Sequence, residues 1–290
     1  MVLDATSWGH EVRFNLIGPF EIIAEDGRSH LPSTPKVCQT LALLLTRPNE
    51  IVTSDSLIRE LWGERPPKSA LTTLQTYIYH ARKLFAKEGM APPGRDLLVT
   101  RSPGYVIQVE DDEVDIRIFE RLIARGQSEL QSGRPEAAVE HLSRALALWR
   151  GPALSNIPAG DVLAGRIVHL EELRIRALQL RIEAENRLGR QRESIPELRA
   201  LVSEYPLNEW FHGQLISALH HTGRRAEALQ AYRDLHRILD EELGLEPSPE
   251  LQRLQLEVLN PSPSVRARFR RLSGGREHRV PHPEYEVPLV

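Results

Sequence analysis

The first part of the chain alternates short extended patterns with turn signals. Residues 13–17 (RFNLI) alternate between apolar and polar side chains, a Gly-Pro pair interrupts them, and residues 20–23 resume an extended apolar pattern. The Asp-Gly pair at 26–27 is typical of a hairpin turn, because both residues tolerate the positive φ that such turns require. A small antiparallel sheet near the N-terminus is therefore predicted.

Two helices are predicted next. The Thr-Pro pair at 34–35 has the features of an N-cap followed by a first helical residue, and the helix continues to about Leu45. Either Thr53 or Ser54 caps a second helix, which presents an apolar face and ends at Gly63.

A third helix begins near Ser69, because the Pro-Pro pair before it is incompatible with helix. One side of this helix is apolar, with residues spaced by three and four: Leu71, Leu74, Ile78, Ala81 and Phe85. The opposite side carries hydroxyls and a cation, from Ser69, Thr72, Thr76, Tyr79 and Lys83, with Thr73 and His80 beside them. No acid occurs from residue 68 to residue 87, which is unusual for a solvent-facing helix.

A compact hairpin follows the third helix. The extended segments LLVTR (97–101) and YVIQV (105–109) flank the turn Ser102-Pro103-Gly104. Small sheets, three helices and a terminal hairpin are the element order of a winged helix-turn-helix domain, in which the hairpin is the wing. This domain is predicted to span residues 12–109.

Residues 110–260 have helical periodicity and lack strand-like alternation. Short turns occur at Gly133, Gly189 and Gly223, and the last two are 34 residues apart, the period of tetratricopeptide-like helix pairs. The first interval is 56 residues, so the repeat is imperfect. Proline at 206 lies where such arrays place it between repeats. The chain is therefore predicted to be mainly α, with an all-α, tetratricopeptide-like array after the winged helix.

Two other segments interrupt this pattern. Residues 148–165 are rich in Gly and Pro and are predicted to be a non-helical insertion. Residues 261–290 are rich in Pro, Arg and Gly without periodicity, which predicts a disordered tail. Stacked helix pairs commonly present a concave protein-binding surface, so the array is expected to bind a partner rather than to act only as a scaffold.

Charge differs between these segments. Residues 12–109 carry a balance of +3 and residues 110–260 a balance of −7, within a net charge of −3 for the 290 residues. A cationic front and an acidic middle suit a nucleic-acid-binding module joined to a protein-binding one.

The single cysteine, Cys38, lies in an apolar helical run and indicates a reducing compartment. The N-terminus has no basic, apolar leader, so a cytoplasmic protein without a membrane anchor is expected.

The sequence lacks the common motifs of catalysis and cofactor binding. It contains no phosphate loop, no GxGxxG, no HExxH and no paired cysteines. Adjacent pairs such as His220-His221 and Glu171-Glu172 point to different sides of one helix, which is poor geometry for a metal or for acid–base work. We therefore expect no catalytic residues, no metal site and no cofactor.

The third helix supplies the candidate DNA-binding residues. Thr72, Thr73, Thr76 and Tyr79 are placed to reach base edges or phosphates, with Gln75 at the side and Ser69 at the start. Arg82 and Lys83 are expected to neutralise phosphates, and Arg101 to contact the DNA backbone or enter the minor groove. For His80, a DNA contact and a plain surface position remain alternatives.

Several motifs in this order resemble one family. RFNLIGPF, LIRELWGERPPKSALTTLQTYIYHARKL, SPGYVIQV, ALALWRGPAL and GRRAEALQAYRDLHRILDEELGLEPSPELQRL are similar to segments of the SARP family, the Streptomyces antibiotic regulatory proteins. The resemblance covers residues 12–259. It implies an OmpR-like winged-helix domain followed by a bacterial transcriptional activation domain, and the chain looks like a small, two-domain member.

The resemblance also implies a function. Members are pathway-specific activators of secondary-metabolite gene clusters that bind promoter direct repeats as more than one protomer and recruit the RNA polymerase holoenzyme. By the OmpR-like pattern, residues 72–83 would contact the major groove. A nucleoid-associated protein in the cytoplasm is implied. The loop before the third helix would contact polymerase through Gly63, Glu64, Arg65, Pro66 and Pro67. The sequence departs from many members in having Thr72, Thr76 and Tyr79 where they carry arginines.

Three alternatives remain open at this stage. The winged helix could bind protein, making the chain an interaction adaptor, or the same DNA contacts could serve a repressor. A concave helical array can also hold a small molecule, so ligand-gated regulation is a third possibility.

Overall fold

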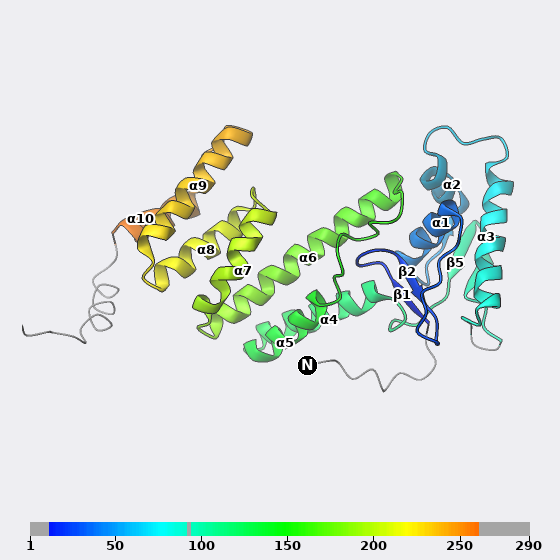
Figure 1. The fold of residues 1–290 in the computed structure, drawn as a ribbon, viewed down its shortest axis with the longest axis horizontal. Coiled ribbons are helices and arrows are strands. Elements are labelled where there is room, and N and C mark those ends of the chain that lie inside the picture. The colour runs from blue at the N-terminus through cyan, green and yellow to red at the C-terminus, as the bar shows by residue number, and fades with distance from the viewer. Residues whose placement is uncertain (1–11, 92–93, 261–290) are drawn as a thin grey trace, which may run out of the picture. The chain divides into compact units, whose positions relative to one another are not determined.

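The computed structural model describes residues 12–91 and 94–260. The chain divides into two compact units, the first ending at Leu188 and the second beginning at Gly189. The strands and the first helices belong to the first unit, and the second unit is helical (Figure 1). The predicted disorder of residues 261–290 concerns a segment outside the described residues.

The first unit opens with the predicted small sheet. Strands β1 (Arg13–Asn15) and β2 (Glu21–Ile23) pair antiparallel, with Phe14 opposite Ile22. The predicted Asp-Gly turn is confirmed, because Gly27 has a φ of 76° and its backbone N–H donates to the carbonyl of Ala24.

Helices α1 (Pro35–Leu45), α2 (Ser54–Trp62) and α3 (Ala70–Lys87) follow within one or two residues of the predicted limits. The hydroxyl of Thr53 accepts a hydrogen bond from the backbone N–H of Ser56, at 3.1 Å, and so caps α2 as expected. Gly63 ends α2 at a φ of 61°, a conformation that favours glycine.

The wing is part of a three-stranded sheet. Strands β4 (Leu98–Arg101) and β5 (Gly104–Ile107) form the predicted hairpin, and β3 (Val52–Thr53) adds to the other edge of β5. β3 was not predicted, because two residues are too few to show alternation. A side chain at Gly104 would lie 2.0 Å from the carbonyl oxygen of Val52, so glycine is required for this pairing.

Helices α4 (Asp115–Gln131), α5 (Pro135–Leu146) and α6 (Asp161–Arg187) complete the first unit. The expectation of a non-helical stretch to residue 165 was wrong at its end, since α6 begins at Asp161. Glycine there was taken as a helix breaker, but an isolated glycine is tolerated in a helix whose other turns pack well.

Hydrogen bonds join the winged helix to these helices. The amide of Asn156 accepts from the backbone N–H of Phe20 at 2.6 Å and donates to its carbonyl at 3.1 Å. The carboxylate of Asp115 accepts from the N–H groups of Leu16 and Ile17, at 2.7 and 2.8 Å. These hydrogen bonds lie within the first compact unit. The domain boundary expected between residues 109 and 110 stays a prediction.

The second unit is a stack of helices: α7 (Gln191–Glu204), α8 (Glu209–His221), α9 (Arg225–Leu243) and α10 (Pro249–Leu259). Gly189 and Gly223 stand at the turns before α7 and α9 with φ values of 74° and 81°, as the repeat pattern predicts. Phe211, Leu215 and Leu235 are buried between these helices. Within the part of the chain that is described, no helix is both long and apolar enough to cross a bilayer.

Candidate nucleic-acid interface

Helix α3 is fixed to the winged helix by one buried face. The buried side chains recur at helical spacing: Ala70, Leu74, Ile78, Ala81 and Phe85. Phe85 packs edge-on against Phe14 of β1, with ring centroids 6.3 Å apart. The remaining faces of α3 are consequently available to solvent or to a partner.

The sequence misplaced one residue of this helix. Leu71 was expected on the buried face but is 50% exposed. It lies about 60° around the helix from Leu74, at the edge of the apolar stripe, and belongs to the first turn, where Ala70 occupies the buried position instead. An exposed leucine beside Thr72 and Gln75 is an apolar group of the kind that contacts a thymine methyl. The angular distance of Leu71 from the centre of the apolar stripe was the sequence signal that could have revealed its exposure.

The predicted site residues lie on the exposed faces. Thr73 is half-buried, and the other nine are exposed. The exposed group consists of Ser69, Thr72, Gln75, Thr76, Tyr79, His80, Arg82, Lys83 and Arg101. Eight of the nine lie on α3 or at its N-cap, and Arg101 lies at the end of strand β4. The structure thus gathers the predicted residues on one helix and the adjoining wing strand.

Two of the threonines are engaged with their own helix. The hydroxyls of Thr73 and Thr76 donate to the carbonyls of Ser69 and Thr72, at 3.0 and 3.1 Å. In this arrangement each hydroxyl oxygen can accept a hydrogen bond from a base amino group. The rings of Tyr79 and His80 meet edge-on with centroids 5.8 Å apart, so the two side chains cover adjacent parts of the same surface.

Arg82 has a contact that the sequence did not indicate. Its Nε donates to the carbonyl of Leu98 at 2.9 Å and one terminal nitrogen donates to the hydroxyl of Thr100 at 2.8 Å. Arg82 therefore ties the C-terminal half of α3 to wing strand β4, in addition to carrying a positive charge at this edge.

The remaining cations differ in how far they are neutralised. Lys87 forms an ion pair with Glu88 at 2.7 Å, and this hydrogen bond holds the pKa of the Glu88 carboxyl below its ordinary value. Among the described residues, Lys83 and Arg101 have no ion-pair partner. Both side chains are accordingly available to neutralise an external anion.

The loop between α2 and α3 is a second exposed feature. Glu64, Arg65, Pro66 and Pro67 are exposed and Gly63 is half-buried. At the base of the loop, Trp62 stacks on Tyr77 of α3 with ring centroids 6.2 Å apart and an interplanar angle of 17°. The loop joins the end of α2 to the N-terminal end of α3 (Figure 1).

The described residues contain no group of three or more His, Cys, Asp or Glu side chains arranged to hold a metal ion. Cys38 is buried, and burial raises the pKa of its thiol. The chemistry available on the exposed surface of α3 is therefore hydrogen bonding, apolar contact and positive charge.

Comparisons with known proteins match both halves of the chain. Residues 114–259 match the family described as the bacterial transcriptional activator domain. Residues 27–107 match the family described as the C-terminal domain of transcriptional regulatory proteins.

Individual relatives are regulators of actinomycetes. The chain is 37% identical to the regulatory protein DnrI of Streptomyces peucetius, over 88% of this chain and 94% of that protein. It is 33% identical to the transcriptional regulator RedD of Streptomyces coelicolor, over 90% and 74%. For the regulatory protein AfsR of Streptomyces griseus the identity is 35%, but the chain spans only 24% of that longer protein.

A solved structure shares the architecture. Mycobacterium tuberculosis EmbR, in complex with a low affinity phosphopeptide, superimposes with a TM-score of 0.81 at 32% identity, covering 92% of this chain and 70% of EmbR. Fold, family models and relatives agree with the resemblance seen in the sequence. The chain belongs to the SARP family of transcriptional regulators, with an OmpR-like winged helix followed by a bacterial transcriptional activator domain.

Proposed function

We propose that this protein activates a secondary-metabolite (antibiotic) gene cluster by binding direct repeats in its promoter and recruiting RNA polymerase. The observation that carries the proposal is the exposed, acid-free surface of α3, which is held from behind by a buried apolar face and flanked by the wing. A helix of this kind fits the major groove, whose width admits one α-helix.

The roles on α3 follow from the side chains. Thr72, Gln75 and Thr76 carry hydrogen-bonding groups suited to base edges, and Leu71 offers the apolar contact. Lys83 and Arg101 neutralise phosphates on either side of the groove, which fixes the register of the helix without specifying sequence.

The exposed loop of residues 63–67 is proposed to contact RNA polymerase. It precedes the base-contacting positions of α3 in the chain, and the Trp62–Tyr77 stack lies at its base. A double variant, Glu64→Ala with Arg65→Ala, is expected to leave promoter affinity unchanged and to abolish activation of a promoter–reporter fusion.

DNA binding is tested by fluorescence anisotropy with the DNA upstream of the regulated genes, at several salt concentrations. Lys83→Ala is expected to weaken binding and to reduce the slope of log affinity against log salt by about 0.9, because one phosphate contact is lost. Arg125→Ala, which removes the same charge from an exposed position on α4, is the matched control and should leave the slope unchanged.

The outcomes separate this function from its alternatives. Equal affinities and slopes for wild type and Lys83→Ala would show that α3 does not dock as proposed. If the protein were an adaptor, it would not change the anisotropy of the labelled DNA. If it were a repressor, it would lower the signal of the promoter–reporter fusion.

A further inference from the structure

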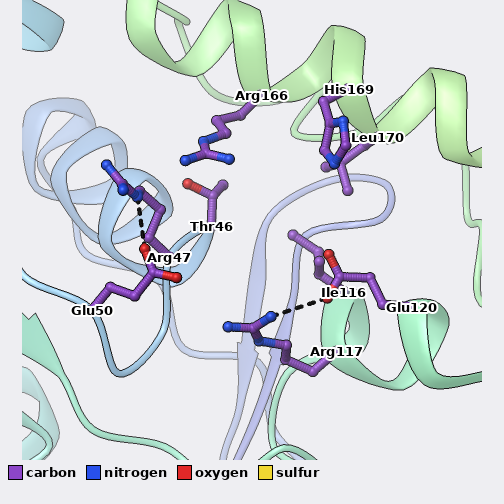
Figure 2. A pocket seen from close by; sticks show the side chains of 9 residues that line it. All are labelled: Thr46, Arg47, Glu50, Ile116, Arg117, Glu120, Arg166, His169 and Leu170. Atoms are coloured by element: carbon purple, nitrogen blue, oxygen red, sulfur yellow. Dashed lines mark hydrogen bonds and ion pairs between the residues drawn. The ribbon is translucent and has the colours of Figure 1, made fainter.

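A small cavity lies inside the first unit, where the end of α1, the start of α4 and the first turns of α6 approach one another (Figure 2). Its volume is about 90 Å³, or about three times the share of one water molecule in the liquid. Buried Ile116 and Leu170 form part of its wall. None of the residues that line the cavity is assigned to DNA or polymerase contact.

Charged side chains from three elements surround this space. Arg47 and Glu50 follow α1, Arg117 and Glu120 come from α4, and α6 contributes Arg166 and His169. In Figure 2 the guanidinium groups of Arg166 and Arg117 lie on different sides of the cavity, and the His169 ring points down toward it from α6.

The cations are only partly satisfied. Arg47 pairs with Glu50 at 3.0 Å and Arg117 pairs with Glu120 at 3.1 Å. Arg166 has no hydrogen bond or ion pair among the described residues, and the Nε of Arg117 is inaccessible to solvent without a hydrogen-bond partner there. Three guanidinium groups therefore face two carboxylates, and at least two donor groups lack acceptors.

Arginine donors without protein acceptors at a partly buried site favour the binding of an anion. A guanidinium binds a carboxylate or phosphate through two parallel hydrogen bonds, and a planar carboxylate would be satisfied by one such group. Arginines that line the space from α4, from α6 and from the segment after α1 instead suit a tetrahedral oxyanion, which accepts hydrogen bonds in several directions. The excess of arginine also disfavours a metal cation.

We propose that this cavity binds phosphate, either as the free ion or as the phosphate group of a small phosphorylated metabolite whose remainder lies outside. A phosphate there would contact Arg166 of the activator domain and Arg47 of the winged helix together. Occupancy would consequently stabilise the contact between α1 and α6, because a ligand that binds the folded state adds to its stability.

The test is isothermal titration calorimetry of the full chain with inorganic phosphate at constant ionic strength, so that screening does not change during the titration. One saturable site is expected. Arg166→Gln is expected to weaken affinity by about tenfold or more, because a charge-assisted pair of hydrogen bonds is lost. Arg166→Lys should give an intermediate affinity, since it keeps the charge and loses the planar fork. Arg125→Gln on α4 is the control for loss of one surface charge and should bind phosphate like the wild type.

Further arms identify the source of the phosphate and exclude the DNA-binding surface. Glucose 6-phosphate is titrated beside glucose, and tighter binding than inorganic phosphate would assign the site to a phosphometabolite. The reverse order would assign it to the free ion. Lys83→Ala should keep the wild-type phosphate affinity. Equal affinities for Arg166→Gln and Arg125→Gln, no saturable binding, or loss of binding in Lys83→Ala would each overturn the proposal.

Discussion

Glu60 on α2 provides the sharpest test of how the winged helix is joined to the activator domain. The residue is 2% exposed. One carboxylate oxygen accepts from the amide of Gln39 at 2.7 Å and from the backbone N–H of Gly160 at 2.6 Å, and the other accepts from the N–H of Leu163 at 2.8 Å. Gly160 is the N-cap of α6 and Leu163 lies in its first turn, so Glu60 caps a helix that belongs to the other domain.

The change Glu60→Ala leaves the backbone N–H groups of Gly160 and Leu163 without acceptors. It also removes one of the two acceptors of the Gln39 amide, which keeps its hydrogen bond to the backbone carbonyl of residue 60. Each buried, unsatisfied donor costs about 1–3 kcal/mol, and removing one partner of a buried charged network costs about 3–5 kcal/mol in total. We expect the free energy of unfolding to fall by about 3–5 kcal/mol. Glu60→Gln keeps one acceptor oxygen and should lose about half of that.

The assay combines urea unfolding, followed by tryptophan fluorescence, with hydrogen exchange at the first turn of α6. In Glu60→Ala the amides of Gly160 and Leu163 should lose protection before the rest of α6 does. Glu64→Ala, an exposed neighbour, is the control and should lie within about 0.5 kcal/mol of the wild type. An equally small effect of Glu60→Ala, with unchanged exchange at Gly160, would refute the capping role.

Three further predictions concern other contacts. Burial raises the pKa of Asp115 to about 6 from an ordinary 3.8, against the hydrogen bonds and the nearby arginine that lower it. The folded state therefore holds this proton more tightly than the unfolded state, and the stability that the proton adds is lost as pH rises through the raised pKa. In urea titrations, the free energy of unfolding of the wild type, measured relative to Asp115→Asn, should fall by about 3 kcal/mol between pH 3.5 and pH 7. A difference that does not change with pH would refute this. Gly104→Ala should destabilise the protein by at least about 2 kcal/mol, because the added methyl group forces β3 away from β5. Gly165→Ala places a methyl group in open space within α6 and should stabilise the protein slightly in thermal melts. Similar effects of the two substitutions would contradict the argument that Gly104 is required for strand pairing. Arg82→Ala removes the hydrogen bonds to β4 and should lower the free energy of unfolding by about 1 kcal/mol. It should weaken DNA binding but, unlike Lys83→Ala, leave the slope of log affinity against log salt unchanged. A slope reduced as in Lys83→Ala would instead make Arg82 a phosphate contact.

Local signals in the sequence were sufficient for most elements of the fold. The capping threonine at 53, the glycines at 189 and 223 and the period of α3 each act within a few residues, so their effects can be inferred from the chain alone. β3 could not be predicted, because its two residues become a strand only through pairing with β5, far along the chain. The start of α6 was also missed, because its cap comes from Glu60 rather than from a neighbouring residue.

The candidate site shows the same distinction. Helical spacing was enough to place Thr72, Thr76 and Lys83 on an exposed surface, because the buried stripe determines the opposite face. It could not show that Arg82 would bind β4, since that contact depends on where the wing folds back. Leu71 was misplaced because it lies at the edge of the apolar stripe, where the angle around the helix alone does not decide whether a side chain is covered.

The junction also bears on how the two domains could communicate. Glu60 of the winged helix caps α6, and Asp115 at the start of α4 accepts from the backbone between β1 and β2. Each domain thus inserts a buried carboxylate into the backbone of the other, and truncation of either partner leaves N–H groups unsatisfied. The cavity lined by Arg166 shares α4 and α6 with this junction and adds the segment after α1. A phosphate bound there would therefore act on the end of α1 through contacts confined to the first unit. On this reasoning, phosphate affinity and winged-helix stability are linked, and Glu60→Ala should weaken phosphate binding while leaving every cavity side chain intact.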